Sequence, residues 1–363
     1  MEFDFHGKVF SVFSIVTFNN NPCQSSSSTS SGNSAFRNGT CFTNNECVAK
    51  GGSVQGSCAS GFGVCCVFVI SDVSRTISEN CTYIQNPGFP TPLTTSTALS
   101  YSVAKSSNDV CFLRLDFESF SLQGPADTLE TSGGVCTDTF VVTTQTGQQI
   151  PTICGQNAGQ HIYVDIGNQA SDTATLAFTF TGSSSNRQWE IKVSQIPCGA
   201  NFAPSPGCLQ YVTGLTGRLT TFNFLDVTGS SHLASTQYTQ CIRQEAGFCC
   251  IRYQVCGDAN SFSLDTTMMA AAAAAQTDNT CTLDYLGIEG ATQQCQVGSG
   301  GSTTSERFCG NFFSTQSAGT ANSIVCDCSP PFAVTVRTDA MQDANAATQP
   351  NRGVCLMFDQ IPC

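Results

Sequence analysis

The sequence is short of charge, and above all of positive charge. Charged residues make up 11% of its 363 positions, whereas a typical globular domain carries about 25%. The 14 lysines and arginines stand against 26 aspartates and glutamates, which gives a formal net charge of −12. Without a basic patch, the chain is not expected to bind nucleic acid. Its surface is expected to consist mainly of Ser, Thr, Asn, Gln and Gly.

Long apolar segments and a recognisable leader are also lacking. No apolar run reaches the roughly 20 residues that a membrane-spanning helix needs, so no transmembrane segment is predicted. Residues 1–8 are acidic and aromatic, and residues 9–18 read V-F-S-V-F-S-I-V-T-F. Since a secretory signal opens with a basic region, we expect that a leader is missing upstream or has been removed. Residues 1–22 are predicted to be an extended segment, a candidate strand for donation to another chain.

Signatures of catalysis are missing as well. The sequence has neither the G-D-S-G-G segment of trypsin-like proteases nor the H-E-x-x-H segment of zinc proteases. It also has no glycine-rich phosphate loop. Its three histidines, His6, His161 and His232, lie far apart in unrelated contexts. We therefore predict that the chain is not an enzyme.

Cysteine, by contrast, is abundant. The chain has 23 cysteines although 40% of its residues are hydrophobic, so the cysteines do not merely compensate for a small core. A count this high indicates an oxidising compartment and a secreted, disulfide-bonded protein. Because the count is odd, at least one cysteine is free or bonded to another chain. The sequons at Asn38 and Asn80 are candidate glycosylation sites.

A closing phrase that occurs twice indicates a duplicated domain. Residues 189–198 read W-E-I-K-V-S-Q-I-P-C, and residues 355–363 read C-L-M-F-D-Q-I-P-C. The region from residue 74 to residue 198 consists of short β-prone runs between Gly, Ser and Thr clusters. Residues 199–207 form a linker that contains Pro and Gly, and the pattern then returns. The chain is therefore predicted to be all-β.

Residues 23–67 form a cysteine-dense module that ends in two adjacent cysteines, Cys65 and Cys66. Adjacent residues of an extended strand point to opposite sides, so these two should bond to different partners. The spacing alone leaves 15 pairings open. The order of the six cysteines resembles the clip domain of arthropod secreted proteins. The resemblance implies the disulfides Cys23–Cys65, Cys41–Cys58 and Cys47–Cys66.

Residues 78–198 resemble a CUB domain. Cys81 is followed by T-Y-I-Q-N-P-G-F-P, and Cys111 precedes an alternating strand that ends in Phe. Cys136 precedes T-D-T-F-V-V, residues 151–155 read P-T-I-C-G, and an aromatic ending completes the match. The resemblance implies a jelly-roll-like β-sandwich. It also implies the disulfides Cys81–Cys111 and Cys136–Cys154.

Residues 208–363 resemble a more divergent copy of the same domain. By correspondence with the first copy, the implied disulfides are Cys208–Cys241 and Cys281–Cys309. The whole chain resembles a group of arthropod secreted proteins that carry clip-like and CUB-like modules together. It is thus predicted to be a clip-like module followed by two tandem CUB sandwiches.

Nine cysteines have no partner in this scheme. They are Cys198, Cys249, Cys250, Cys256, Cys295, Cys326, Cys328, Cys355 and Cys363. Cys198 is the candidate for an unpaired or intermolecular cysteine, because its own domain offers no spare partner; alternatively it ties the two CUB domains together. A zinc site that joins Cys326 and Cys328 to the adjacent pair Cys249 and Cys250 is conceivable, but the secreted context favours disulfides.

The CUB resemblance also implies a calcium site in the second domain. CUB domains that bind Ca²⁺ use three acidic positions, whose oxygens suit a hard cation. The corresponding residues are Asp265, Asp284 and Asp339. The alternative is that these are three loop carboxylates in water. In the first domain the corresponding residues are Gln123, Asp138 and Thr181. With one charge among them, that site is expected to be lost.

These patterns favour a secreted, non-catalytic protein that acts in extracellular protein or glycan binding or adhesion, through loops on rigid sandwiches. One alternative is a structural subunit of an extracellular polymer, filament or coat, assembled by strand addition or an intermolecular disulfide. A second alternative is a regulatory cofactor of a protease cascade, which only the clip resemblance suggests. The sequence names no partner and no oligomeric state.

Overall fold

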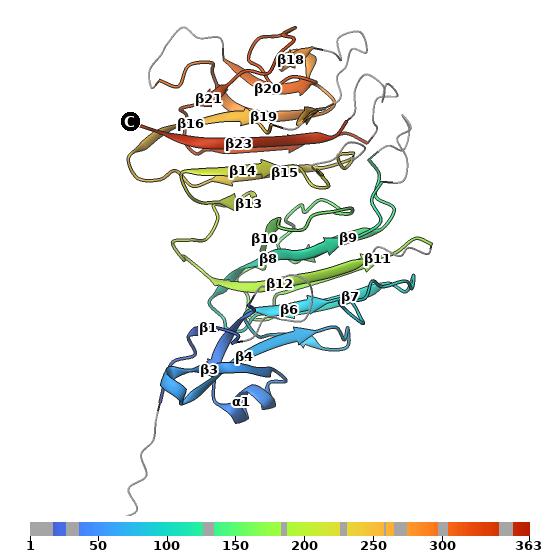
Figure 1. Ribbon diagram of the computed structural model, residues 1–363, viewed down its shortest axis with the longest axis vertical. Helices are drawn as coiled ribbons and strands as arrows, with labels where there is room; N and C mark the ends of the chain where they lie inside the picture. The colour runs from blue at the N-terminus through green and yellow to red at the C-terminus, as the bar shows by residue number, and fades with distance from the viewer. Residues whose placement is uncertain are drawn as a thin grey trace, which may run out of the picture. The chain divides into compact units, whose positions relative to one another are not determined.

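The computed structural model describes residues 17–26, 36–125, 134–182, 187–225, 231–257, 259–264, 274–296, 304–340 and 351–363. The chain divides into two compact units, residues 1–69 and residues 70–363. Strands dominate both units (Figure 1), which confirms the predicted all-β class. Within the described ranges, no helix is both long and apolar enough to cross a membrane.

A small antiparallel sheet forms the first unit. Its strands are β1 (Pro22–Gln24), β2 (Asn38–Phe42), β3 (Ser53–Cys58) and β4 (Gly63–Ile70). Strand β2 pairs with both β1 and β4, and β3 also pairs with β4. A short 3₁₀ turn, η1 (Ala59–Gly61), connects β3 to β4.

One helix and a small apolar cluster complete the first unit. Helix α1 (Asn44–Ala49) begins after Thr43, whose hydroxyl oxygen accepts the Glu46 N–H at 3.3 Å and so caps the first turn. The buried apolar cluster consists of Phe42, Cys47, Cys66 and Phe68. Because a core this small stabilises a fold only weakly, the unit depends on its disulfides.

Two four-stranded sheets form the first sandwich of the second unit. One sheet has the order β6 (Thr82–Gln85), β12 (Gln188–Pro197), β8 (Val110–Ser121) and β10 (His161–Asp165). The other has the order β5 (Thr76–Ile77), β7 (Leu99–Ala104), β11 (Thr173–Thr179) and β9 (Thr139–Thr144). Neighbouring strands are antiparallel except β5 and β7.

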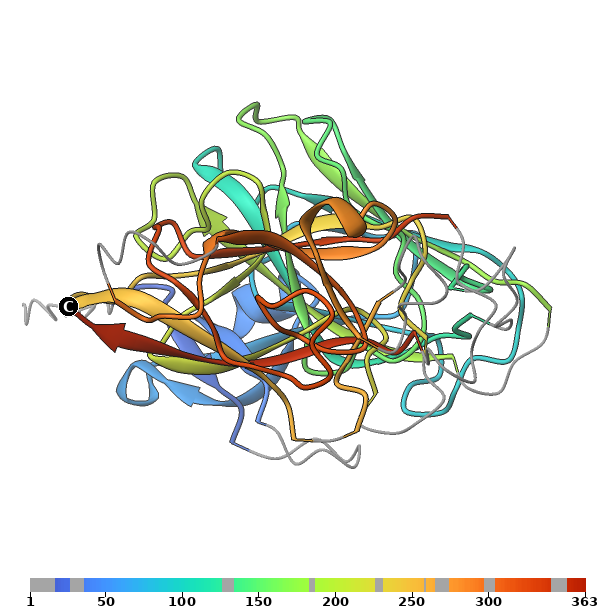
Figure 2. The same cartoon turned by 90° about the horizontal axis from the view of Figure 1, so that it is seen from above.

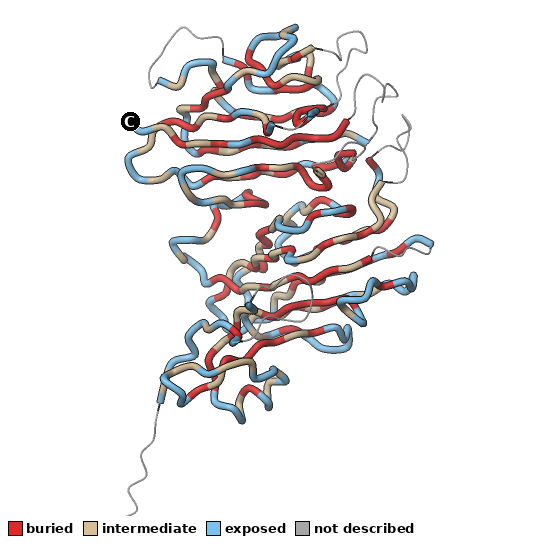
Figure 3. The backbone as a smooth tube through the Cα atoms, in the orientation of Figure 1, coloured by how far each residue is buried: buried red, intermediate tan, exposed pale blue. Residues whose placement is uncertain are grey.

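Alternating side chains give each strand an inner and an outer face. Leu113, Leu115 and Phe117 of β8 are at most 1% exposed, while the residues between them are partly exposed (Figure 3). Across the core, the Trp189 ring of β12 stacks on Phe178 of β11 with 4.2 Å between ring centroids. The period of two predicted from sequence therefore builds the hydrophobic core.

A six-stranded sheet and a second sheet around β23 form the second sandwich. The six strands are β13 (Cys208–Val212), β15 (Gln237–Ile242), β22 (Ala333–Arg337), β19 (Tyr285–Ala291), β20 (Ser305–Gly310) and β18 (Ala275–Thr277). The facing sheet contains β14 (Thr216–Thr220), β23 (Gly353–Pro362), β16 (Phe248–Val255) and β21 (Val325–Asp327), and β17 (Phe262–Ser263) also pairs with β23. A 3₁₀ turn, η3 (Asp278–Thr280), follows β18.

The repeated closing phrase of the sequence marks equivalent strands. Strands β12 and β23 are each ten residues long and end at a proline. Each lies inside its sheet, β12 between β6 and β8 and β23 between β14 and β16. In Figure 2 the red strand β23 runs beside β16 toward the C-terminus. The sequence repeat thus corresponds to the long inner strand of each sandwich.

Buried amide side chains join the two sandwiches within the second unit. The Oδ1 atom of Asn223 accepts the Gln156 N–H at 3.0 Å, and the Oδ1 atom of Asn157 accepts the Asn223 N–H at 2.7 Å. Gln210 Nε2 donates to the His161 carbonyl oxygen at 3.0 Å. Asn157, Gln210 and Asn223 are at most 6% exposed. A buried amide is costly unless it is paired, so these bonds fix how the two sandwiches meet.

His161 belongs to this junction. Its Nε2 atom lies 3.0 Å from the carbonyl oxygen and 3.2 Å from the backbone nitrogen of Tyr211. Burial lowers the pKa of His161 to about 4. The imidazole ring is therefore neutral near pH 7, and its Nε2 atom contacts the Tyr211 backbone of the other sandwich.

Candidate functional site

A buried ion pair lies in the first sandwich, at the positions that correspond to the calcium ligands of CUB domains. The Asp138 and Arg187 side chains are 0% exposed. The guanidinium donates from Nε to Oδ2 at 2.8 Å and from Nη2 to Oδ1 at 2.9 Å. The N–H groups of Gln123 and Thr181 donate to the same two oxygens. The three aligned positions do meet, and Arg187 supplies the positive charge there.

The environment of Asp138 keeps its carboxylate ionised. Burial alone raises its pKa, but the hydrogen bonds from Arg187, Thr181 and Gln123 outweigh burial and lower the pKa below its ordinary value of 3.8. Because its pKa is lowered, the Asp138 carboxylate stabilises the folded state at pH values above its ordinary pKa of 3.8. That stabilisation is lost as the pH falls through the folded-state pKa.

The second sandwich has a histidine in the equivalent role. Asp284 is fully buried, and its Oδ1 atom accepts the Asp339 N–H at 2.7 Å. Its Oδ2 atom lies 3.0 Å from Nε2 of His232, an ion-pair distance outside hydrogen-bond geometry. Asp265, the third predicted calcium ligand, lies outside the described residues.

This arrangement does not fit the calcium site that the resemblance implies. Protein groups contact both oxygens of Asp284, so a calcium ion would have to displace His232 from Oδ2. Over the described ranges, no group of three His, Cys, Asp or Glu residues is placed to hold a metal ion. The alternative of loop carboxylates in water also fails for Asp284, because that side chain is buried.

Six of the seven disulfides implied by the resemblances are present. They are Cys23–Cys65, Cys41–Cys58, Cys47–Cys66, Cys136–Cys154, Cys208–Cys241 and Cys281–Cys309. The adjacent Cys65 and Cys66 bond to different partners, as expected of neighbours on one strand.

The seventh implied disulfide, Cys81–Cys111, is absent. Cys111 is bonded to Cys198 instead, with 4.8 Å between their Cα atoms, and Cys81 is the free cysteine. Cys81 precedes β6 and Cys111 lies in β8, on opposite sides of β12. Two strand spacings of ~4.8 Å exceed the Cα separation of about 7 Å that a disulfide can bridge. The prediction that Cys198 is unpaired or bonded to another chain is therefore also wrong, because Cys198 is bonded to Cys111.

Four further disulfides cross-link the second sandwich. They are Cys249–Cys363, Cys250–Cys328, Cys256–Cys355 and Cys295–Cys326. A zinc site at Cys326 and Cys328 would need thiolates. Because both sulfurs are bonded to other cysteines, they cannot provide it.

The free thiol and the two sequon asparagines differ in their exposure to solvent. Cys81 is half-buried, and burial raises the pKa of its thiol, which makes the thiol a weak nucleophile. Asn80 is exposed, and its Oδ1 atom accepts the N–H groups of Cys81 and Gln195, each at 2.8 Å. Asn38 opens β2 and is half-buried. Glycosylation at both sequons stays a prediction.

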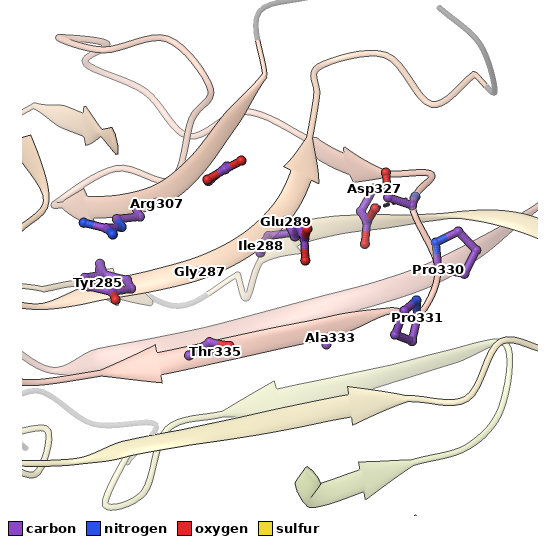
Figure 4. Close-up of a pocket in the computed structure, with 12 residues that line it drawn as sticks. Tyr285, Gly287, Ile288, Glu289, Arg307, Asp327, Pro330, Pro331, Ala333 and Thr335 are labelled. Atoms are coloured by element: carbon purple, nitrogen blue, oxygen red, sulfur yellow. Dashed lines mark hydrogen bonds between the residues drawn. The ribbon is translucent and has the colours of Figure 1, made fainter. Parts of the chain in front are cut away.

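A groove of about 540 Å³ crosses the outer face of the second sandwich (Figure 4). Its floor is at Gly287 of β19, where there is no side chain to fill the space. At one end the Arg307 guanidinium lies 4.8 Å from the centre of the Tyr285 ring. At the other end lie Glu289 and Asp327, and Figure 4 shows their carboxylates directed into the same space. Glu306, next to Arg307 in the sequence, also lines the groove, so the Arg307 end carries both charges while the other end is anionic.

Asp327 is unusual among the buried acids of this chain. It is 1% exposed, and its Oδ1 atom accepts the Ser329 N–H at 2.7 Å. Burial, helped by the charge of Glu289 and opposed by the hydrogen bond from Ser329, raises the pKa of Asp327 to about 6. Unlike Asp138, it contacts no guanidinium, and unlike Asp284, it contacts no histidine in the described part of the chain.

The sequence pattern does not identify three of these residues. Arg187 carries no local signal, because its partner Asp138 is 49 positions away. His232 stands in the sequence as an isolated histidine. Asp327 stood inside the Cys326-Asp-Cys328 motif, where only the cysteines were considered. The flanking cysteines were the one available signal for Asp327.

Replacement of Arg187 by methionine should destabilise the protein strongly. It leaves the Asp138 carboxylate buried without its cation, which costs about 3–5 kcal/mol. The matched control is Arg252→Met, which breaks an ion pair with Asp359 whose side chains are 40% and 30% exposed. That change should cost about 1 kcal/mol or less. Urea unfolding at pH 7 measures both, and equal losses would contradict the role given to Arg187.

Asp284→Asn should lower stability without affecting calcium. The change weakens the contact with His232, and the loss should be about 1–3 kcal/mol. Calorimetry with CaCl₂ should give no saturable heat for the wild type or for the control Asp278→Asn. A saturable heat in the wild type that vanishes only in Asp284→Asn would restore the calcium site.

Asp327→Asn should stabilise the protein, and more so at higher pH. A raised folded-state pKa means that ionisation of the carboxyl costs folding free energy as the pH rises past 3.8 toward the folded value of about 6. The full cost at pH 7.5 is about 3 kcal/mol. Urea unfolding of both proteins at pH 5 and pH 7.5 should show a larger advantage of the variant at pH 7.5. An equal or smaller advantage at pH 7.5 would mean that folding does not raise the pKa of Asp327.

Comparison with known proteins adds a family assignment for part of the chain. Residues 205–361 match the model of the animal CUB domain. No curated protein matches the chain.

Solved structures that are similar to the chain include two of MASP-1 CUB domains. The CUB1-EGF-CUB2 region of rat MASP-1 is 16% identical, with 78% of this chain and 99% of that chain covered and a TM-score of 0.26. The Ca²⁺-bound CUB2 domain of MASP-1 is 18% identical, with 34% and 99% covered and a TM-score of 0.27. The extracellular region of zebrafish Gpr126/Adgrg6 is 10% identical, with 79% and 33% covered and a TM-score of 0.27. TM-scores this low carry no argument, so the family evidence is the match of residues 205–361, in the second sandwich, to the animal CUB domain model.

Proposed function

We propose that the chain is a secreted, non-catalytic protein that binds extracellular proteins or glycans through its cross-linked sandwiches. The observation that carries this proposal is a CUB domain in a chain whose eleven disulfides take up 22 of the 23 cysteines. Disulfides in such numbers persist in oxidising compartments. Sheets fixed at many points hold their loops and faces in position for recognition.

Two histidines support a role without catalysis. His161 is held neutral against Tyr211 at the junction of the sandwiches. His232 is 1% exposed and faces Asp284 inside the second sandwich. A general base has to reach a nucleophile or a substrate in an accessible site. Both rings are instead occupied by contacts within the fold.

The alternative of an extracellular polymer has one supporting observation, the single free thiol at Cys81. Its half-buried position and raised pKa disfavour an intermolecular disulfide. Strand donation by residues 1–22 depends on residues 1–16, which lie outside the described ranges. A role as a protease-cascade cofactor has no support beyond the clip-like cysteine order. We therefore place the binding function first.

The binding function can be tested with the full chain secreted from eukaryotic cells. The native protein should bind at least one member of an array of extracellular proteins and glycans saturably. Reduction and alkylation should abolish that binding, because they release the sheet faces from their fixed positions. On a non-reducing gel the protein should run as a monomer.

A disulfide-linked ladder on that gel, with no saturable binding on the array, would favour the polymer instead. The Cys81→Ser variant separates the two outcomes further. A ladder that collapses in this variant would identify the thiol as the cross-link. Binding that survives the change would leave the proposed function intact.

A further inference from the structure

Two disulfides hold Asp327 in place at the anionic end of the groove. Its neighbour Cys326 is bonded to Cys295, and its other neighbour Cys328 is bonded to Cys250. The backbone on both sides of Asp327 is therefore anchored. A charged group held in this way is preorganised, because it loses little freedom when a ligand arrives.

The Asp327 carboxylate is buried but incompletely satisfied. Its Oδ1 atom accepts the Ser329 N–H, while none of the described residues donates a hydrogen bond to its Oδ2 atom. Buried carboxylates in folded proteins are normally paired with a cation or fully hydrogen-bonded. The two other fully buried aspartates considered above, Asp138 and Asp284, do face a cationic or titratable partner. Asp327 lacks one, and its unpaired oxygen faces the groove.

The groove around Asp327 has the shape and charge to admit a long cationic side chain. Glu289 is exposed and lies across the same space from Asp327. Strand β19 leaves its regular register with β20 between Gly287 and Ala291, the stretch that contains Glu289. The floor at Gly287 leaves room for the aliphatic stem. Pro330 and Pro331 line the anionic end and offer apolar contact to such a stem.

We propose that this groove binds a lysine or arginine side chain of a protein partner, with the cationic head group between Asp327 and Glu289. The proposal rests on the binding function proposed above and specifies the chemistry of one partner. The cation would supply the donor that Asp327 lacks. A charge-assisted hydrogen bond of this kind is among the stronger polar contacts. The net charge of −12 favours the approach of a basic partner surface.

The two guanidinium groups beside Tyr285 give the bound side chain a direction. Arg307 and Arg337 both lie against the Tyr285 ring, 4.8 Å and 5.7 Å from its centre. These two guanidinium groups repel a second cation. A basic side chain therefore enters from the side of Asp327.

A metal ion is the competing occupant. Asp327 and Glu289 are two carboxylates and Glu306 lines the same groove, but no three His, Cys, Asp or Glu residues in the described ranges are placed to hold a metal ion together. Calcium takes 6–8 oxygen ligands, so two carboxylates make a poor site for it. A primary ammonium has three N–H donors and a guanidinium has five, so either can donate to both carboxylates and keep its other donors toward water.

The test is an NMR titration of the ¹⁵N-labelled full chain. The probes are N-acetyl-lysine amide, N-acetyl-arginine amide and the uncharged N-acetyl-norleucine amide. The lysine and arginine probes should produce saturable shifts at the backbone N–H groups of Gly287, Glu289 and Ser329, and the norleucine probe should not. Asp327→Asn keeps the acceptor for Ser329 and should weaken binding about tenfold. Glu289→Gln, an exposed change that leaves the fold intact, should weaken it about threefold.

The matched control is Glu118→Gln, an equal change of charge at an exposed position of β8 in the first sandwich. It should leave the titration unchanged. Equal affinities of the wild type, Asp327→Asn and Glu289→Gln would overturn the proposal, and so would the same shifts produced by CaCl₂ at matched ionic strength. The titration uses no partner protein. It can therefore fail while the array binding survives, and it can succeed even if the array shows none.

Discussion

Face-to-face packing of antiparallel sheets is the interaction on which the other features depend. In the first sandwich, β8 and β12 meet β11 through buried side chains, with the Trp189–Phe178 stack between the sheets. Because successive side chains of a strand point to opposite faces, the strands that build the core also determine what faces water. On β19 the buried Leu286 and Ile288 alternate with the groove residues Gly287 and Glu289. A shift of one residue would bury the glutamate and expose the isoleucine, so the core fixes the groove.

Three buried carboxylates show how differently the fold treats negative charge. Asp138 is neutralised by a guanidinium that donates to both of its oxygens. Asp284 is contacted by an imidazole and a backbone N–H. Asp327 has a backbone N–H and no cation, and burial raises its pKa to about 6. The first two stabilise the sandwiches from inside. The third costs folding free energy, which fits a group that awaits an external partner.

Much of the fold could be predicted from the sequence, because its signals are local or repeated. Alternating apolar residues indicated strands, and the shared closing phrase marked the inner strands β12 and β23. Most of the cysteine pairs followed from resemblance. Cys81 could not be placed in this way, because its distance from Cys111 depends on β12 lying between their strands, which is a tertiary property. Arg187 was missed for a similar reason: the chain must fold before it meets Asp138.

The calcium prediction stays a prediction, and one side chain argues against it. The acidic positions suggested by resemblance carry the expected residue types, yet His232, 52 positions before Asp284 in the sequence, contacts the oxygen that a metal would need. No local pattern ties that histidine to the aspartate. The groove at Asp327 was likewise invisible, because it needs the register of β19 against β20 and the two disulfides beside Asp327.

Mass-spectrometric mapping of the disulfides in the secreted, functional protein tests the account most directly. Proteolysis without reduction should yield the linked peptide of Cys111 and Cys198, the two links that flank Asp327, and Cys81 as a free thiol. A link between Cys81 and Cys111, or predominantly reduced cysteines in protein that still functions, would contradict the picture of extracellular sandwiches fixed by cross-links.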